Sequence, residues 1–232
     1  MTAPPPVPQA RRRRWPLVAV ILISVGALGA AHSPLMALAD VEILGASRAD
    51  VAAVIDGAGV GEGALLLWID TGSLEAVVRA EPWIADVRVD RILPNRLLVE
   101  VIEHQPVLWI EGVLNWMLVA RDGTVLEVAL APSQGLLRAA LAFPDREPGD
   151  QPVDPLWGEV VEMALVLADD LGGTMTLETR GSEMWTEVFG HQVRLGSPID
   201  LADKARTLRA LFSEELPEGA TVDVSSPLRP AI

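Results

Sequence analysis

The sequence lacks cysteine and tyrosine, and its 232 residues include only three phenylalanines and three histidines. Without cysteine the chain can form no disulfide, no thiolate metal site and no cysteine nucleophile. His32, His104 and His191 lie far apart, and none has a second histidine four residues on, the spacing of a helical zinc site. The sequence therefore predicts no metal centre, and its aromatic content depends mainly on seven tryptophans.

The motifs of common hydrolases are missing as well. There is no Gly-x-Ser-x-Gly nucleophile motif and no Ser-x-x-Lys pair. Residues 59–64 match Gly-x-Gly-x-x-Ala, but a phosphate loop follows a strand, and the residues before these glycines have helical periodicity. The neighbouring carboxylates at 169–170 and 214–215 would point about 100° apart on a helix, which is typical of solvated faces. We therefore expect no catalytic residues, no cofactor and no enzyme activity.

Basic residues are scarce beyond the N-terminal region. Every acidic residue follows position 39, where 32 carboxylates accompany only 14 basic side chains, the chain's 18 less the four arginines at 11–14. Duplex nucleic acid binds basic surfaces, so this acidity argues against nucleic acid as a partner. Half of the residues are apolar, which is enough for folding by burial without disulfides.

One long apolar run lies near the N-terminus. Trp15 to Met36 contains no charged residue, and as a helix its 22 positions would measure about 33 Å, more than the roughly 30 Å of a bilayer core. The run is preceded by Arg11, Arg12, Arg13 and Arg14. We therefore expect a transmembrane helix at 15–36, with Trp15 at the interface, residues 1–14 as a cytoplasmic tail, and the remainder outside the cytoplasm.

A cleaved signal peptide is the alternative interpretation of the same run. The strictly apolar core, Leu17–Ala31, is only 15 residues long. Ala37-Leu38-Ala39 before Asp40 has the small-x-small form of a cleavage site. Both interpretations export the rest of the chain.

Residues 38–106 have the pattern of a small α+β module with the order β-α-α-β-β. The expected elements are a strand at 41–44, helices after positions 50 and 70, and strands around 87–89 and 97–102, joined by a turn at 94–95. Ser47 and Asp50 have capping-box spacing before the first helix, and Asp70 or Thr71 is the expected N-cap of the second.

Residues 107–232 predict a mixed β domain with flanking helices. Expected strands lie at 107–111, 116–120, 124–128, 136–143, 175–179, 184–189, 192–195 and 221–224. Apolar stripes predict one helix opening at Asp154-Pro155 and ending before Gly172, and another capped by Asp200 and ending before Pro217. The fold class is therefore α+β throughout the exported part.

Taken in order, several stretches resemble the FtsQ/DivIB family of bacterial cell-division proteins. They are residues 41–45, 81–89, 93–97, 101–107, 193–196 and 222–225, after a single arginine-flanked apolar span. The module at 38–106 resembles that family's POTRA domain, and residues 107–232 resemble its β domain. His104 and Ser225 depart from the family, since arginine is usual at the first position and occurs in some members at the second.

The resemblance implies a non-enzymatic scaffold in the cell membrane at the division septum. It implies FtsB/FtsL-type partners and, through them, an FtsW/FtsI-type synthase complex that makes septal cell wall. A terminal strand at a sheet edge offers a physical route, because its unpaired backbone groups can accept a partner strand. The expected partner-binding residues are Thr221, Val222, Asp223, Val224, Ser225 and Ser226. We expect proline at Val222 or Val224 to weaken partner capture without unfolding the domain.

Two other classes fit an exported chain of this kind. One is an exported cell-envelope hydrolase, which would bring catalytic side chains together in a cleft. The other is a secretion-type POTRA chaperone module, which would receive incoming strands.

Overall fold

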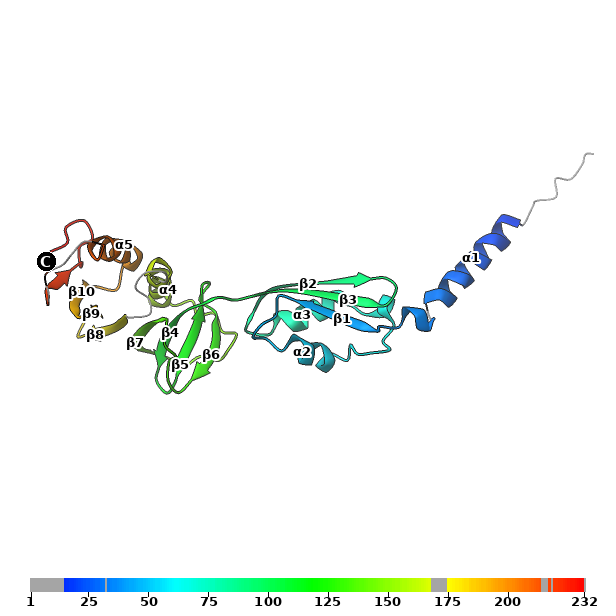
Figure 1. Cartoon of the computed structure of the whole chain (residues 1–232), viewed down its shortest axis with the longest axis horizontal. Coiled ribbons are helices and arrows are strands. Elements are labelled where there is room, and N and C mark those ends of the chain that lie inside the picture. Colours follow the sequence, from blue (N-terminus) through cyan, green and yellow to red (C-terminus); the bar gives the residue numbers. More distant parts are fainter. Residues whose placement is uncertain (1–14, 32, 168–174, 214–216, 218, 232) are drawn as a thin grey trace, which may run out of the picture.

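The computed structural model describes residues 15–31, 33–167, 175–213, 217 and 219–231. Figure 1 shows helix α1 and two sheet-containing modules following one another in chain order along one long axis, with α1 at one end and the C-terminus at the other. Between these ends lie a three-stranded sheet and an eight-stranded sheet.

The N-terminal helix α1 (Trp15–Ala31) is shorter than the expected helix at 15–36. A separate 3-10 turn, η1 (Pro34–Met36), follows it. Proline lacks an N–H and disfavours helical backbone in the residue before it, which explains why the helix does not continue unbroken to Met36. Among the described residues, no helix combines the length and apolar character needed to cross a membrane. The expected cytoplasmic tail at 1–14 lies outside the described residues.

The first module has the predicted β-α-α-β-β order. Its elements are β1 (Asp40–Leu44), α2 (Val51–Gly57), the 3-10 turn η2 (Leu66–Trp68), α3 (Thr71–Arg79), β2 (Ile84–Ile92) and β3 (Arg96–Glu103). The strand order is β1-β3-β2, with β1 parallel and β2 antiparallel to β3. Alternate residues of β3, including Leu97 and Val99, are fully buried against the helices, because successive side chains of a strand point to opposite faces.

The capping prediction for this module is confirmed at one helix and wrong at the other. Asp70 caps α3 by accepting the N–H groups of Gly72 and Ser73. At α2 the N-cap is Asp50 alone, whose carboxylate accepts the N–H of Ala53 at 3.1 Å. Ser47 caps nothing, because its N–H and hydroxyl both donate to a distant carboxylate described below.

The second module is built on the eight-stranded sheet, in the order β11-β10-β9-β8-β7-β4-β5-β6. Its strands are β4 (Pro106–Gly112), β5 (Trp116–Ala120), β6 (Val125–Ala129), β7 (Leu137–Phe143), β8 (Thr176–Arg180), β9 (Glu183–Val188), β10 (His191–Gly196) and β11 (Thr221–Asp223). All the strands expected in this module are present, with ends that differ by at most one residue. Their order along the sheet is not their order in the sequence, so β11 lies at one edge and β6 at the other.

Helices α4 (Pro155–Leu167) and α5 (Leu201–Leu211) pack together on one face of this sheet. The expected continuation of α4 beyond Leu167 lies outside the described residues. Asp200 precedes α5 as predicted, but it adopts a left-handed conformation (φ 55°) and its side chain makes no capping hydrogen bond. Glu159 of α4 accepts the N–H of Leu201 at 2.8 Å instead, so a neighbouring helix replaces the local cap.

The junction between the modules is short and contains a tryptophan. Trp83, which directly precedes β2, packs against a small apolar cluster on the face of the second sheet that α4 and α5 leave uncovered. The guanidinium of Arg48 lies 4.8 Å above the Trp83 ring. His104 donates its N–H to the carbonyl of Trp83 at 2.8 Å, and Arg121 donates its own to that of Gln105 at 3.2 Å.

Candidate partner-binding edge

Strand β11 is the last strand of the eight-stranded sheet. It pairs in parallel with β10, in the register Gln192 with Thr221, Val193 with Val222, and Arg194 with Asp223. Figure 1 shows it as the red arrow at the C-terminal end of the molecule, farthest from α1. The sequence predicted a strand here, and its place at an edge follows only from the pairing of the other seven strands.

The backbone of β11 faces two ways. The N–H of Val224 donates to the carbonyl of Arg194 on β10 at 2.9 Å, whereas the N–H of Asp223 points away from β10. Backbone groups alternate sides along a strand, so Val222 and Val224 bond inward, and Thr221 and Asp223 present their groups outward. The interpretation that Val222 and Val224 carry edge donors is therefore wrong.

The side chains of residues 221–226 also fall into two groups, buried and accessible. Val222 and Val224 are 0% exposed and belong to the core beneath α5, so neither side chain is available to a partner. Thr221 and Ser226 are exposed, and Asp223 and Ser225 are half-buried. Proline at either valine would remove an inward hydrogen bond and disturb the core, so we now expect it to destabilise the sheet.

An ion-pair network fastens β11 to its neighbours. Arg194 of β10 donates to Asp223 at 2.9 Å and also pairs with both carboxylate oxygens of Glu183 on β9. Hydrogen bonds from Ser225, followed by those from Arg194, lower the pKa of Asp223. The Arg194 guanidinium likewise lowers the pKa of Glu183. Asp223, expected as a partner-binding residue, thus uses its side chain within its own sheet.

The outward flank of Asp223 meets the end of the chain. Asp223 and Ala231 form an antiparallel bridge in which each N–H donates to the other's carbonyl, at 2.8 and 3.0 Å. The sequence did not reveal the role of Ala231, because residues 225–232 contain two prolines and no strand pattern. No local pattern could have revealed this contact, which depends on the chain folding back on itself.

The other residues that the sequence singled out lie elsewhere. Arg11 to Arg14 fall outside the described residues, and Trp15 opens α1 with 79% of its surface exposed. Among the described residues, no group of three or more histidine, aspartate or glutamate side chains could hold a metal ion. His104 is half-buried at the junction, where its Nδ1 lies 3.7 Å from a carboxylate oxygen of Asp122.

A family model described as "POTRA domain, FtsQ-type" matches residues 36–104, the region of the three-stranded sheet and its helices. The chain therefore contains a POTRA domain of the class found in cell-division proteins. Three relatives, each named "Cell division protein FtsQ", extend the match well beyond that domain.

The relative from Myxococcus fulvus is 37% identical over 198 residues, covering 79% of this chain and 68% of that protein. The relative from Mycolicibacterium smegmatis is 29% identical over 220 residues, which is 93% of this chain and 62% of that protein. The relative from Corynebacterium glutamicum is 23% identical over 215 residues, 90% of this chain and 92% of that protein. The chain belongs to the FtsQ family of cell-division proteins.

Proposed function

We propose that this chain is a membrane-anchored scaffold of the division machinery that captures FtsB/FtsL-type proteins along the outer edge of β11. Through them it helps control an FtsW/FtsI-type synthase complex and septal cell-wall synthesis. In this proposal the chain itself catalyses no reaction. The single observation that carries it is the terminal position of β11 among the described strands: its outward side faces no other strand of the sheet, and at Asp223 it is covered by the bridge to Ala231.

Backbone pairing at a sheet edge is a common mode of peptide recognition. Main-chain hydrogen bonds supply affinity, and side chains beside the edge supply selectivity. Here β11 is held rigidly for that purpose, because Val222 and Val224 are buried and Arg194 ties it to β9 and β10. A partner would therefore meet a preorganised edge, which lowers the ordering cost of binding.

Anchoring to the cell membrane, with a single pass and a cytoplasmic N-terminus, is proposed from the N-terminal segment. Its large apolar side chains, among them Leu22 and Ile23, are exposed on α1, and no charged residue interrupts residues 15–36. Four arginines precede the segment, which favours a cytoplasmic N-terminus. Retention of this segment as an anchor predicts a membrane-extracted chain that still contains Trp15, whereas cleavage after Ala39 would yield a chain starting at Asp40.

Two experiments test the function. A fluorescently tagged copy is expected to form a band at midcell, and a uniform envelope signal would contradict the division role. In a pull-down of the FtsB-type protein from the same organism, Thr221→Pro removes an outward donor and is expected to lose capture, while Thr221→Val keeps the N–H and should retain it. Equal capture by both folded variants would exclude this edge.

A further inference from the structure

The last described residues of the chain cover part of the proposed edge. Ala231 pairs with Asp223 through both of that residue's backbone groups, the N–H and the carbonyl. A strand from another protein would need the same two groups. It therefore cannot pair across Asp223 while Ala231 is in place.

We propose that residues 227–231, called here the C-terminal clasp, compete with the partner for the edge of β11 and must leave before a partner strand can bind. The inference rests on the proposed function, because it concerns the same edge. It adds a regulatory step to that site: the chain itself controls how much of the edge is open.

The clasp makes few contacts with the rest of the chain, as expected of a segment that can detach. Besides the Ala231 bridge, Pro227 accepts a hydrogen bond from the Thr207 hydroxyl at 3.3 Å, and Arg229 donates its N–H to Ser226 at 3.0 Å. Leu228 is 92% exposed, so it adds almost no apolar burial. The clasp is thus held mainly by a few hydrogen bonds, each of which contributes little in exchange for water.

Strand β11 is held quite differently from its cover. Val222 within β11 and Val224 directly after it are fully buried, and Arg194 pairs with Asp223 from the side of β10. The clasp can therefore detach while β11 stays in the sheet. Covering an edge strand also protects it from unwanted pairing with other chains, which gives such a segment a use before the partner arrives.

Competition between the clasp and the partner would change the apparent dissociation constant of the partner. The apparent dissociation constant equals the intrinsic constant divided by the fraction of molecules with an open edge. For a cover held largely by two backbone hydrogen bonds, we expect removal to tighten partner binding by about three- to tenfold.

The test uses the full chain in detergent and the purified FtsB-type protein of the same organism as the probe. A chain ending at Ser226 and the variant Ala231→Pro should both bind about three- to tenfold more tightly. Ala231→Pro lacks the N–H that donates to Asp223, whereas the control Ala231→Val keeps it and should bind like the parent. Unchanged or weaker binding by both clasp variants would overturn the inference.

The two proposals fail in different ways. If the clasp variants bind like the parent while Thr221→Pro still loses capture, the clasp inference falls and the edge remains the binding site. If Thr221→Pro also binds normally, the proposed edge itself is wrong. Hydrogen exchange without partner gives a second reading: the Asp223 amide should exchange faster in the chain ending at Ser226, and unchanged protection would also overturn the clasp.

Discussion

Gly196 and Ser225 approach each other so closely that a β-carbon built on Gly196 would lie 2.7 Å from the β-carbon of Ser225. Gly196 ends β10 with a φ of +70°, and Ser225 follows β11, so this contact sets how β11 leaves the sheet. Only glycine combines that backbone conformation with that proximity. The route of the chain toward the clasp therefore depends on a residue outside β11.

Gly196→Ala tests this contact. The positive φ alone should cost about 1 kcal/mol, and the contact with Ser225 should bring the loss in the free energy of unfolding to about 2–4 kcal/mol. Gly190→Ala is the matched control, because Gly190 has a φ of +80° with nothing within 4 Å of an added β-carbon. Urea unfolding would measure both, and equal losses would mean that the approach of Ser225 carries no cost.

Lys204 of α5 is the chain's single lysine and is only 2% exposed. Burial lowers its pKa, although Asp200 and Glu159 act in the opposite direction, and its ammonium donates to the carbonyl of Ser197 at 2.6 Å. Because the folded state binds this proton more weakly than the unfolded state, stability should rise as the pH passes the lowered pKa toward 10.5.

The composition leaves few other groups whose titration could obscure that of Lys204. With no cysteine and no tyrosine, Lys204 and the α-amino group are the only groups of this sequence whose ordinary pKa lies between about 7.5 and 10.5. Thermal unfolding should show stability increasing as the pH rises toward 10.5 in the parent and not in Lys204→Met. Stability that rises equally in both chains would assign the effect to another group.

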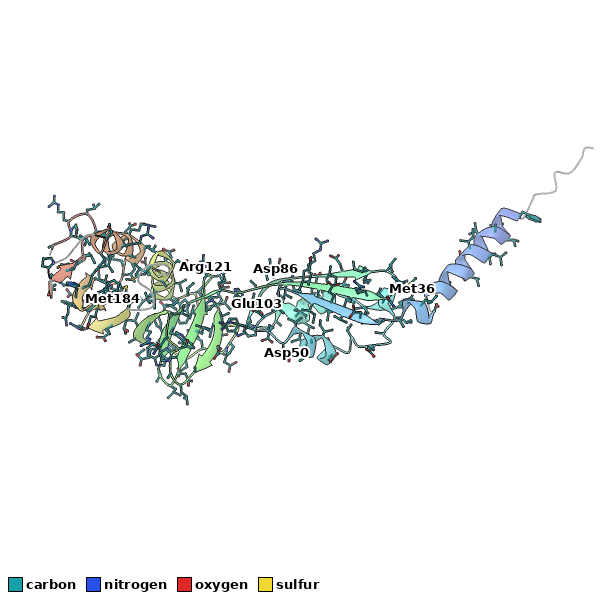
Figure 2. All side chains as sticks on the ribbon, in the orientation of Figure 1. Met36, Asp50, Asp86, Glu103, Arg121 and Met184 are labelled. Atoms are coloured by element: carbon teal, nitrogen blue, oxygen red, sulfur yellow. The ribbon has the colours of Figure 1, made fainter. Side chains whose placement is uncertain are left out.

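Glu103, at the end of β3, holds the loop before α2. Partial burial would raise its pKa, but hydrogen bonds from the Ser47 hydroxyl and from the N–H groups of Ala49, Arg48 and Ser47 outweigh this effect and lower the pKa to about 2. Figure 2 shows Glu103 at the end of the first module that faces the second sheet. The carboxylate thus fixes the loop that carries Arg48, whose guanidinium lies over the Trp83 ring at the junction.

A carboxylate whose pKa is lower in the folded state stabilises the fold fully when the pH is above its pKa in the unfolded state. This stabilisation is lost as the pH falls toward the pKa of the folded state. The stabilisation from Glu103 should therefore be complete above about pH 5 and disappear between pH 4.5 and about 2. Glu103→Gln is expected to cost about 1–2 kcal/mol at pH 7 and to lose less stability than the parent on acidification. Parallel acid-unfolding curves for the two chains would refute this role.

Arg194 joins three strands, β9, β10 and β11, through Glu183 and Asp223. These side chains are about one-third exposed, so water and salt screen the pairs, and Arg194→Met should lower the free energy of unfolding by much less than the loss of a buried ion pair would. The exposed pair of Arg206 with Asp203 is the control, and Arg206→Met should cost less than about 0.5 kcal/mol. Urea unfolding at low and high salt would compare them, with the larger salt dependence expected for the parent relative to Arg194→Met.

Periodicity predicted most of the elements because it reports burial directly. The alternation of Leu97, Val99 and Val101 and the stripe of Leu74 and Val78 place apolar residues on one face, and any compact fold of this segment buries that face. Asp70 was found as a cap for a similar reason, since its partners lie two and three residues away.

Predictions failed where the partner is distant in sequence. Ser47 donates its N–H to Glu103, which lies 56 residues away. The N-terminus of α5 is capped by Glu159, which lies 42 residues before Leu201. Local spacing identifies residues able to cap, but a nearby carboxylate from another element competes for the same donors.

The sequence by itself determined the classes of element, their order, the absence of thiol chemistry and the acidity of residues 40–232, because each depends on composition or on neighbouring residues. Only the tertiary structure decided that β11 lies at an edge, that Val222 and Val224 bond inward, and that Ala231 covers Asp223. The physical reason is that strand pairing is made between segments far apart in the chain, so the side of a strand that stays open depends on where every other strand has gone.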